Sequence, residues 1–182
     1  MRYIGQVVAI DAMPMTVLVD LVNGWASIPR HEDGRDSAAY PPVADLAGQL
    51  GFSAPELSDQ ELAATADRIY PAFTAPDAGR RAELVTEFLD EASVRPGLHL
   101  VRAELRRGWS VPDPHAALLA ASAIALREFL ADHEPDRLGV CTGSRCVDVF
   151  VDASPGGRRR FCSVTCQNRA RVAAFRDRRK PG

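Results

Sequence analysis

The order of apolar and polar positions along the first 136 residues predicts mainly helices, with a few short strands. Met15–Ala26 is a continuous apolar stretch that fits either a strand or a helix. Short strands are expected over Tyr3–Ile10 and in a hairpin formed by Leu98–Leu105 and Trp109–Val111. The expected helices are a short one from Pro41–Pro42 to Gly51, one from the capping box Ser58–Glu61 to near Pro71, one over Thr74–Ala92, and one from Asp113–Pro114 to Pro135.

The last of these helices has the most distinctive pattern. The run His115–Ala131 is apolar nearly all round, which is typical of a helix that is buried on every side. We therefore expect it to form the centre of the domain. Together these elements predict an α+β fold in which helices dominate.

A different pattern begins after residue 140. Val147, Val149 and Val151 alternate with polar or aromatic residues, which predicts a strand. A Ser-Pro-Gly-Gly turn and a return strand over Arg158–Phe161 are expected to follow. Ser163 is then a candidate N-cap for a helix over Val164–Arg179. A cysteine knuckle, a hairpin and a helix in this order predict a small treble-clef-like zinc finger.

All four cysteines of the chain lie in this second region. Their spacing, C-x4-C-x15-C-x3-C, places two close pairs on either side of a short stretch, which is typical of one structural zinc ion. A segment of this length builds little core and needs a cross-link. Two disulfides or redox-active thiols are the alternative, although disulfides do not persist in a reducing compartment. The expected zinc ligands are Cys141, Cys146, Cys162 and Cys166.

Composition adds a division of charge. The 182-residue chain has a formal net charge of −2. Residues 141–182 carry ten basic and three acidic side chains, or +7, whereas the first 140 residues carry 12 basic and 21 acidic ones, or −9. This segregation predicts two modules, residues 1–136 and residues 137–182. The chain has no apolar run long enough to cross a membrane and no apparent secretion signal, so we expect a cytoplasmic protein.

Arginine stripes along the predicted C-terminal helix indicate a nucleic-acid partner. Arg169 and Arg176 form one stripe and Arg171 and Arg178 another, each with a spacing of seven residues. Arginine is well suited to phosphate groups and guanine edges. A solvated helix, or one whose apolar strip docks on the acidic body, is the alternative. The full set of expected DNA contacts is Arg158, Arg159, Arg160, Asn168, Arg169, Arg171, Arg176, Arg178, Arg179 and Lys180.

The region from Arg137 to Lys180 resembles the zinc finger of the CGNR family. The similarity rests on the Arg-Leu pair before Cys141, the F-x-D-x-S run at Phe150, the R-F-C-S run at Cys162 and the Asn168-Arg169 pair. Gln167 stands where the family usually has glycine, and the Pro-Gly-Gly turn replaces a more polar one. Asn168 and Arg169 could equally brace the zinc knuckle through hydrogen bonds.

Members of this family usually carry an N-terminal ABATE domain and are described as stress-induced transcription regulators. Leu18–Asn23 resembles the LDLVN-type stretch that opens that domain, and this favours a helix for Met15–Ala26. The resemblance implies a DNA-binding regulator whose N-terminal domain senses a small-molecule effector or dimerises. We expect a homodimer, because a single finger supplies few base contacts.

Other functions have less support in the sequence. The candidate effector pocket is Asn23, Trp25 and Trp109, although both tryptophans could simply be packing residues. The finger contains no histidine, which argues against a nuclease, and the chain has no common catalytic motif, so we expect no enzyme. An enzyme in the N-terminal domain would need a deep pocket at His99 or Asn23. The main alternative to DNA binding is a zinc-stapled interaction module whose basic finger docks on an acidic surface.

Overall fold

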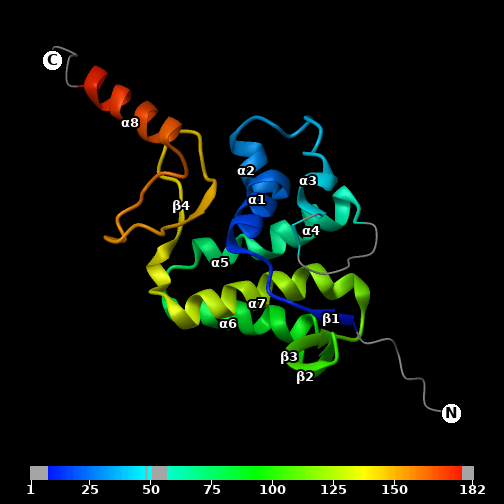
Figure 1. Ribbon diagram of the computed structural model, residues 1–182. Helices are drawn as coiled ribbons and strands as arrows, with labels where there is room; N and C mark the ends of the chain where they lie inside the picture. Colours follow the sequence, from blue (N-terminus) through cyan, green and yellow to red (C-terminus); the bar gives the residue numbers. More distant parts are fainter. Residues whose placement is uncertain (1–7, 48, 51–56, 178–182) are drawn as a thin grey trace.

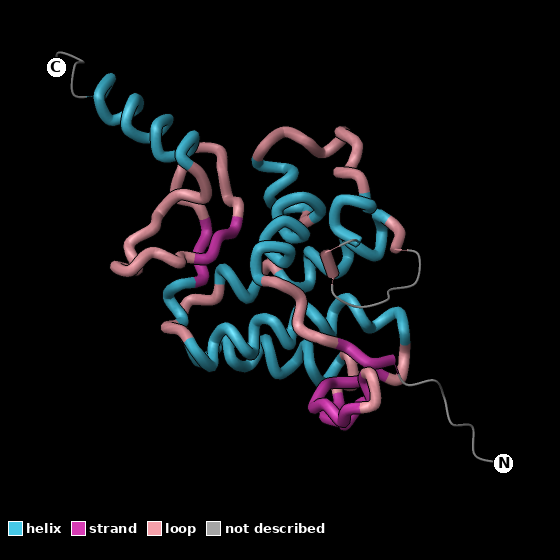
Figure 2. Tube along the Cα trace, viewed as in Figure 1, coloured by secondary structure: helices cyan, strands magenta, loops and turns pink. Residues whose placement is uncertain are grey.

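The computed structural model describes residues 8–47, 49–50 and 57–177, and it has the expected mixed, helix-dominated fold (Figure 1). A bundle of helices forms the body, with a small sheet at one end and the cysteine-rich region at the other (Figure 2). Residues 3–7 of the first expected strand and the predicted helix stop at Gly51 lie outside the described residues. No helix in the described ranges is long and apolar enough to span a membrane.

The apolar stretch after residue 14 is a helix, α1 (Met15–Trp25). Val17, Leu18, Leu21 and Val22 are buried along one face of it, at the spacing of a helix that covers a core. This resolves the choice between strand and helix. Two short helices follow, α2 (Ser27–Glu32) and α3 (Val43–Ala47), of which only α3 was expected.

The next helices show how caps set their boundaries. Helix α4 (Asp59–Ile69) begins with the predicted capping box, in which Ser58 and Glu61 satisfy each other's backbone N–H groups. A short helix α5 (Pro71–Thr74) was not expected. Helix α6 (Ala78–Glu91) begins four residues later than predicted, because the Asp77 side chain accepts a hydrogen bond from the Arg80 N–H and acts as N-cap.

Helix α7 (Ala117–Asp132) is the buried centre of the body, as expected, and a 3-10 turn over Pro114–Ala116 precedes it. Every residue from Ala120 to Leu126 is buried. Five of these seven residues are alanine or serine, whose small side chains let α6, α4 and α1 approach closely.

A three-stranded antiparallel sheet lies at one end of the body. Its order is β1 (Val8–Ile10), β3 (Glu104–Val111) and β2 (Arg95–Val101). A hairpin was expected here, but its turn lies at residues 102–103, inside the stretch Leu98–Leu105 that was expected to form a single arm. Arg102 and Ala103 form its two-residue turn with φ values of 49° and 66°, as a type I′ turn requires.

The cysteine-rich region differs from prediction in its strands. Val149–Val151 is a strand, β5, but its antiparallel partner is β4 (Leu138–Val140), which follows a 3-10 turn over Pro135–Arg137. The expected return strand over Arg158–Phe161 is wrong, because side chains and single backbone contacts hold that segment. Asp152 accepts from the Arg159 N–H at 2.7 Å, and the Thr142 N–H donates to the Arg160 carbonyl at 2.9 Å.

Helix α8 (Val164–Asp177) follows and projects away from the body (Figure 1). The two strands before it pack against the body, since Leu138 and Val149 are fully buried in the same core as the helices. The finger is therefore joined to the body through its strands and exposed through its helix.

Candidate metal centre

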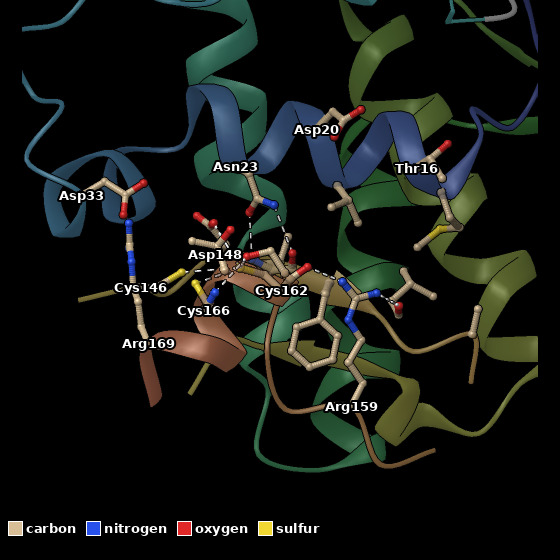
Figure 3. Close-up of a pocket in the computed structure, with 18 residues that line it drawn as sticks. Thr16, Asp20, Asn23, Asp33, Cys146, Asp148, Arg159, Cys162, Cys166 and Arg169 are labelled. Atoms are coloured by element: carbon tan, nitrogen blue, oxygen red, sulfur yellow. Dashed lines mark hydrogen bonds between the residues drawn. The ribbon is translucent and has the colours of Figure 1, made fainter. Parts of the chain in front are cut away.

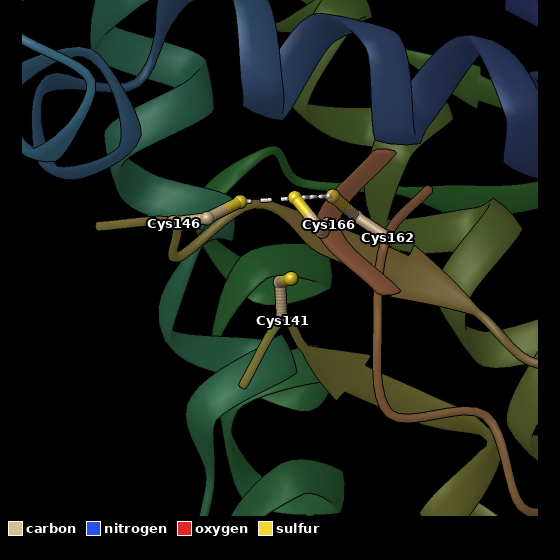
Figure 4. A group of neighbouring side chains, drawn as sticks. All are labelled: Cys141, Cys146, Cys162 and Cys166. Carbon is tan, nitrogen blue, oxygen red and sulfur yellow. Dashed lines mark hydrogen bonds between the residues drawn. The ribbon is translucent and has the colours of Figure 1, made fainter. Parts of the chain in front are cut away.

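Four cysteine side chains converge between the β4–β5 pair and the start of α8 (Figure 4). Their sulfur atoms all lie within 4.8 Å of one another, and three of the four cysteines are buried. The Sγ atoms of Cys146 and Cys162, and those of Cys162 and Cys166, are 3.6 Å apart. Sulfur ligands of a zinc tetrahedron with bonds of about 2.3 Å lie about 3.8 Å apart, so the spacing suits zinc. It is far too long for a disulfide, and all four thiols are free.

The backbone around the first cysteine pair holds the sulfur atoms in place. The Cys141 N–H donates to the Asp148 carbonyl at 2.8 Å and so closes the loop between the two strands. The Gly143 N–H points at the Cys141 sulfur, 3.4 Å away. A Cβ atom at Gly143 would come within 3.3 Å of that sulfur, which explains why glycine occupies this position.

The second cysteine pair is held by the start of α8. The Cys166 N–H donates to the Ser163 hydroxyl at 3.2 Å, which confirms Ser163 as a cap and places Cys166 in the first helical turn. Burial raises the pKa of the Cys162 thiol to about 12, and burial also raises the pKa of Cys146. These sulfurs would ionise only beside a cation, which a zinc ion supplies.

Arg159 braces this centre although the residue as a whole is exposed. Its guanidinium donates to the carbonyls of Phe161 (2.9 Å), Val151 (3.1 Å) and Cys162, and it lies over the Phe150 ring. These hydrogen bonds give Arg159 a structural role in the knuckle, and its expected contact with DNA stays a prediction.

Asp152 supports the same turn and was not among the site residues expected from the sequence. The carboxylate is buried and accepts from the N–H groups of Ser154 (2.8 Å) and Arg159 (2.7 Å). Hydrogen bonding to the Ser154 side chain, and then to the Arg159 N–H, lowers the pKa of Asp152. The F-x-D-x-S run thus has a local structural explanation.

Two side chains of the body hold the finger in place. The Asn23 amide donates to the Val149 carbonyl at 3.0 Å and accepts from the Val149 N–H at 2.7 Å (Figure 3). The Tyr70 hydroxyl donates to the Val147 carbonyl at 3.1 Å. Asn23 was expected in a pocket, and its role as a clamp on β5 was not foreseen.

A cavity of about 730 Å³ lies between α1 and the finger. Its walls include Met15, Val19 and Asn23 from α1, and Val149 and Cys162 from the finger (Figure 3). Of the three expected pocket residues, only Asn23 lines it.

The other candidate residues of the body lie elsewhere. Trp25 is buried in the core and donates to Asp59, and Trp109 lies against the Arg127 guanidinium. Neither tryptophan lines the cavity between α1 and the finger, and both pack against other side chains. His99 lies on the hairpin against Gly97 and Gly108, and it does not line the cavity.

The remaining expected DNA contacts fall into two groups. Arg178, Arg179 and Lys180 lie outside the described residues. The other group is exposed on or beside α8 and comprises Arg158, Arg160, Asn168, Arg169, Arg171 and Arg176. Among the described residues, neither Asn168 nor Arg169 forms a hydrogen bond with the knuckle, so the structure gives no support to the bracing role. Val172 and Phe175 are 49% and 53% exposed, which argues against a helix docked on its own body.

Comparison with known proteins agrees with this geometry. The model of the CGNR zinc finger family matches residues 137–179, a range that includes all four cysteines and the whole of α8. No curated protein matches the chain. The cysteine centre is a zinc site within a CGNR zinc finger.

Proposed function

Because residues 137–179 match a zinc finger, we propose that this chain binds DNA through α8 and acts as a transcription regulator. The observation that carries the proposal is the projection of α8 from the body with Arg169, Arg171 and Arg176 exposed along it. An isolated α-helix of this kind fits the major groove of DNA. The zinc centre fixes its first turn, and thereby the direction in which the arginines point.

Charge supports the same face. Arg158 and Arg160 lie beside the start of α8 and are exposed like the three arginines along it, so positive charge gathers at this end of the molecule. Arginine binds phosphate in a bidentate manner, and such contacts position a protein on DNA before any base is read. Because α8 projects from the body, the acidic body would stay away from the phosphates.

The test is a salt series of binding to mixed-sequence duplex DNA. We expect affinity to fall steeply with salt, and each of Arg171→Ala and Arg176→Ala to reduce the slope by about 1. Arg80→Ala, on the exposed side of α6, is the matched control and should leave the slope unchanged. Arg159→Ala is unsuitable, because it would disturb the zinc knuckle. Absence of DNA retention at low salt would refute the proposal.

The second candidate is a protein-interaction module that presents its basic helix to an acidic partner. The exposed Val172 and Phe175 favour it, since apolar side chains among arginines suit a protein surface. Competition separates the two candidates. An acidic polypeptide such as polyglutamate should not displace a DNA duplex from a genuine DNA-binding face at equal charge concentration.

We propose that the body contains an effector site in the cavity between α1 and the finger. Its volume suits a small molecule, and a ligand there would contact both parts of the chain. Asp20, Asp33 and Asp148 line the cavity, and so do Arg169 and Arg159, whose guanidinium already binds backbone carbonyls. The zinc–thiolate centre adds further negative charge, so the electrostatic potential in the cavity favours an organic cation. Octylamine should therefore raise the melting temperature more than octanol does. Val19→Phe, which narrows the cavity, should remove the difference.

The regulator would be cytoplasmic, would respond to stress and would act as a homodimer, because one finger reads few bases. The proposal assigns no catalysis to the body.

A further inference from the structure

Three leucines at the tip of the β2–β3 hairpin are exposed to solvent. Leu98, Leu100 and Leu105 are 65%, 72% and 71% exposed. Leu100 pairs with Leu105 across the hairpin, and Leu98 lies two residues from Leu100, so all three share one face. A contiguous exposed apolar patch of this kind marks an interaction surface.

The strand that carries two of these leucines is also the outer edge of its sheet. The strand order β1-β3-β2 leaves one side of β2 without a partner strand among the described residues. Edge strands are usually protected by charged residues or bulges. Between Pro96 and Val101, however, β2 contains no charged side chain.

These two features together point to another β-strand as partner. A helix could cover the leucines, and DNA could accept an apolar wedge, but neither would pair with the edge N–H and C=O groups. We infer that β2 pairs with β2 of a second copy of this chain, antiparallel and centred on His99. In that register Leu98 faces the partner's Leu100, and Leu100 faces the partner's Leu98, so the strand is complementary to itself.

The charges of β3 permit this arrangement. Glu104, Arg106 and Arg107 lie on β3, and the two copies of β3 would be three strand spacings apart, about 14 Å. Charges at that separation are largely screened at physiological salt, where the Debye length is about 8 Å. Repulsion between the two sets of arginines therefore does not oppose pairing.

The size of the surface sets the expected strength. One strand pair and six leucines fall short of the roughly 1,200 Å² that stable interfaces bury, so the free dimer should be weak. Two fingers bound to one DNA duplex would strengthen it through effective concentration. Only this last role rests on the proposed function, because the strand pairing itself requires no DNA.

Sedimentation equilibrium of the full chain over a wide concentration range tests the inference. We expect a monomer–dimer equilibrium that Leu100→Arg weakens at least about tenfold. Ile28→Arg, at an exposed apolar position on α2, is the matched control and should leave it unchanged. Circular dichroism should show that both variants remain folded.

The register has its own test. In the double variant Leu98→Asp/Leu100→Lys, each aspartate would face a lysine of the partner, so the dimer should recover part of the affinity that either single change removes. A parallel pairing would place like charges opposite each other and would show no recovery.

Three results would overturn the inference: a monomer at every concentration, a dimer insensitive to Leu100→Arg, or a monomer that binds anionic vesicles through the leucines. A dimer that does not bind DNA would refute the proposed function and leave this inference intact.

Discussion

Asn23 illustrates how much a single side chain can determine in this molecule. Its amide offers a donor and an acceptor together, as the N–H and C=O of one residue in a neighbouring strand would do. It uses both on Val149, whose own side chain is fully buried. Asn23 thereby takes the place of a neighbouring strand residue at the outer edge of β5, and it holds the finger on α1.

Replacing Asn23 should release this clamp. Asn23→Leu keeps the approximate volume but leaves both polar groups of Val149 without a partner, which should cost about 2 kcal/mol of unfolding free energy. Urea unfolding measures the change. Asn23→Asp keeps an acceptor for the Val149 N–H but loses the donor to the Val149 carbonyl. Amide hydrogen exchange at Val149 should therefore be faster than in wild type and slower than in Asn23→Leu. Unchanged exchange at Val149 in both variants would contradict the clamp.

Two adjacent arginines of α6 make a sharper comparison at this scale. Arg81 is buried, and its guanidinium donates to the carbonyls of Ala72, Ala75 and Pro135. Arg81→Met should destabilise the chain by about 3 kcal/mol, because three carbonyls lose their donor. Arg80 forms only exposed ion pairs with Glu83 and Glu87, so Arg80→Met should cost about 0–1 kcal/mol. Thermal unfolding of the two variants side by side checks the contrast, and equal losses would contradict it.

At the scale of an element, the start of α4 carries a pH-dependent contribution. Hydrogen bonds from the Ser58 N–H and hydroxyl, and then from His115, lower the pKa of Glu61 from 4.5 to about 2. A carboxyl whose pKa is lower in the folded state stabilises the fold above the unfolded pKa. Its contribution is therefore present above about pH 4.5 and is lost as the pH falls towards 2.

The measurement is acid unfolding of wild type against Glu61→Gln. Glutamine can still complete the capping box but carries no charge. We expect the stability difference between the two proteins to shrink as the pH falls through this window. A difference that stays constant from pH 7 to pH 2 would show that the charge of Glu61 is not involved.

Elements with strong local signals could be predicted from the sequence. The capping box gave the start of α4, the apolar run of α7 gave the core helix, and the cysteine spacing gave the metal centre. Each depends on neighbours in the chain, through hydrogen bonds of one turn, burial on every side or short loops. The finger helix was found for the same reason, since Ser163 caps it locally.

What was missed depends on partners distant in sequence. Strand β4 is three residues long and is a strand only because Val149–Val151 lies beside it. The roles of Asn23 and Arg159 depend on carbonyl groups that the fold brings to them. The two tryptophans were placed in a pocket on residue type alone, whereas neither lines the cavity between α1 and the finger.

At the scale of the whole molecule, removal of zinc should unfold only part of the finger. Helix α8 and the knuckle depend on the four sulfurs, but β4 and β5 share the core of the body. Excess chelator should therefore lower helicity by about the content of α8 and leave the fluorescence of the buried Trp25 unchanged. Cys162→Ser should behave like the chelated protein, and purified wild type should contain one zinc per chain. Cooperative loss of the whole fold on chelation would contradict this division.

The way β4 and β5 flank the knuckle has a consequence for metal uptake. Pairing of these strands brings residues 140 and 149 together, so the loop with Cys141 and Cys146 is already closed when the metal arrives. The chain entropy of that closure is lost during folding of the body and need not be lost again. An excised peptide of residues 137–179 would have to supply it from the zinc bonds. The peptide should therefore bind zinc less tightly than the intact chain, and it should lose its zinc to a weaker chelator.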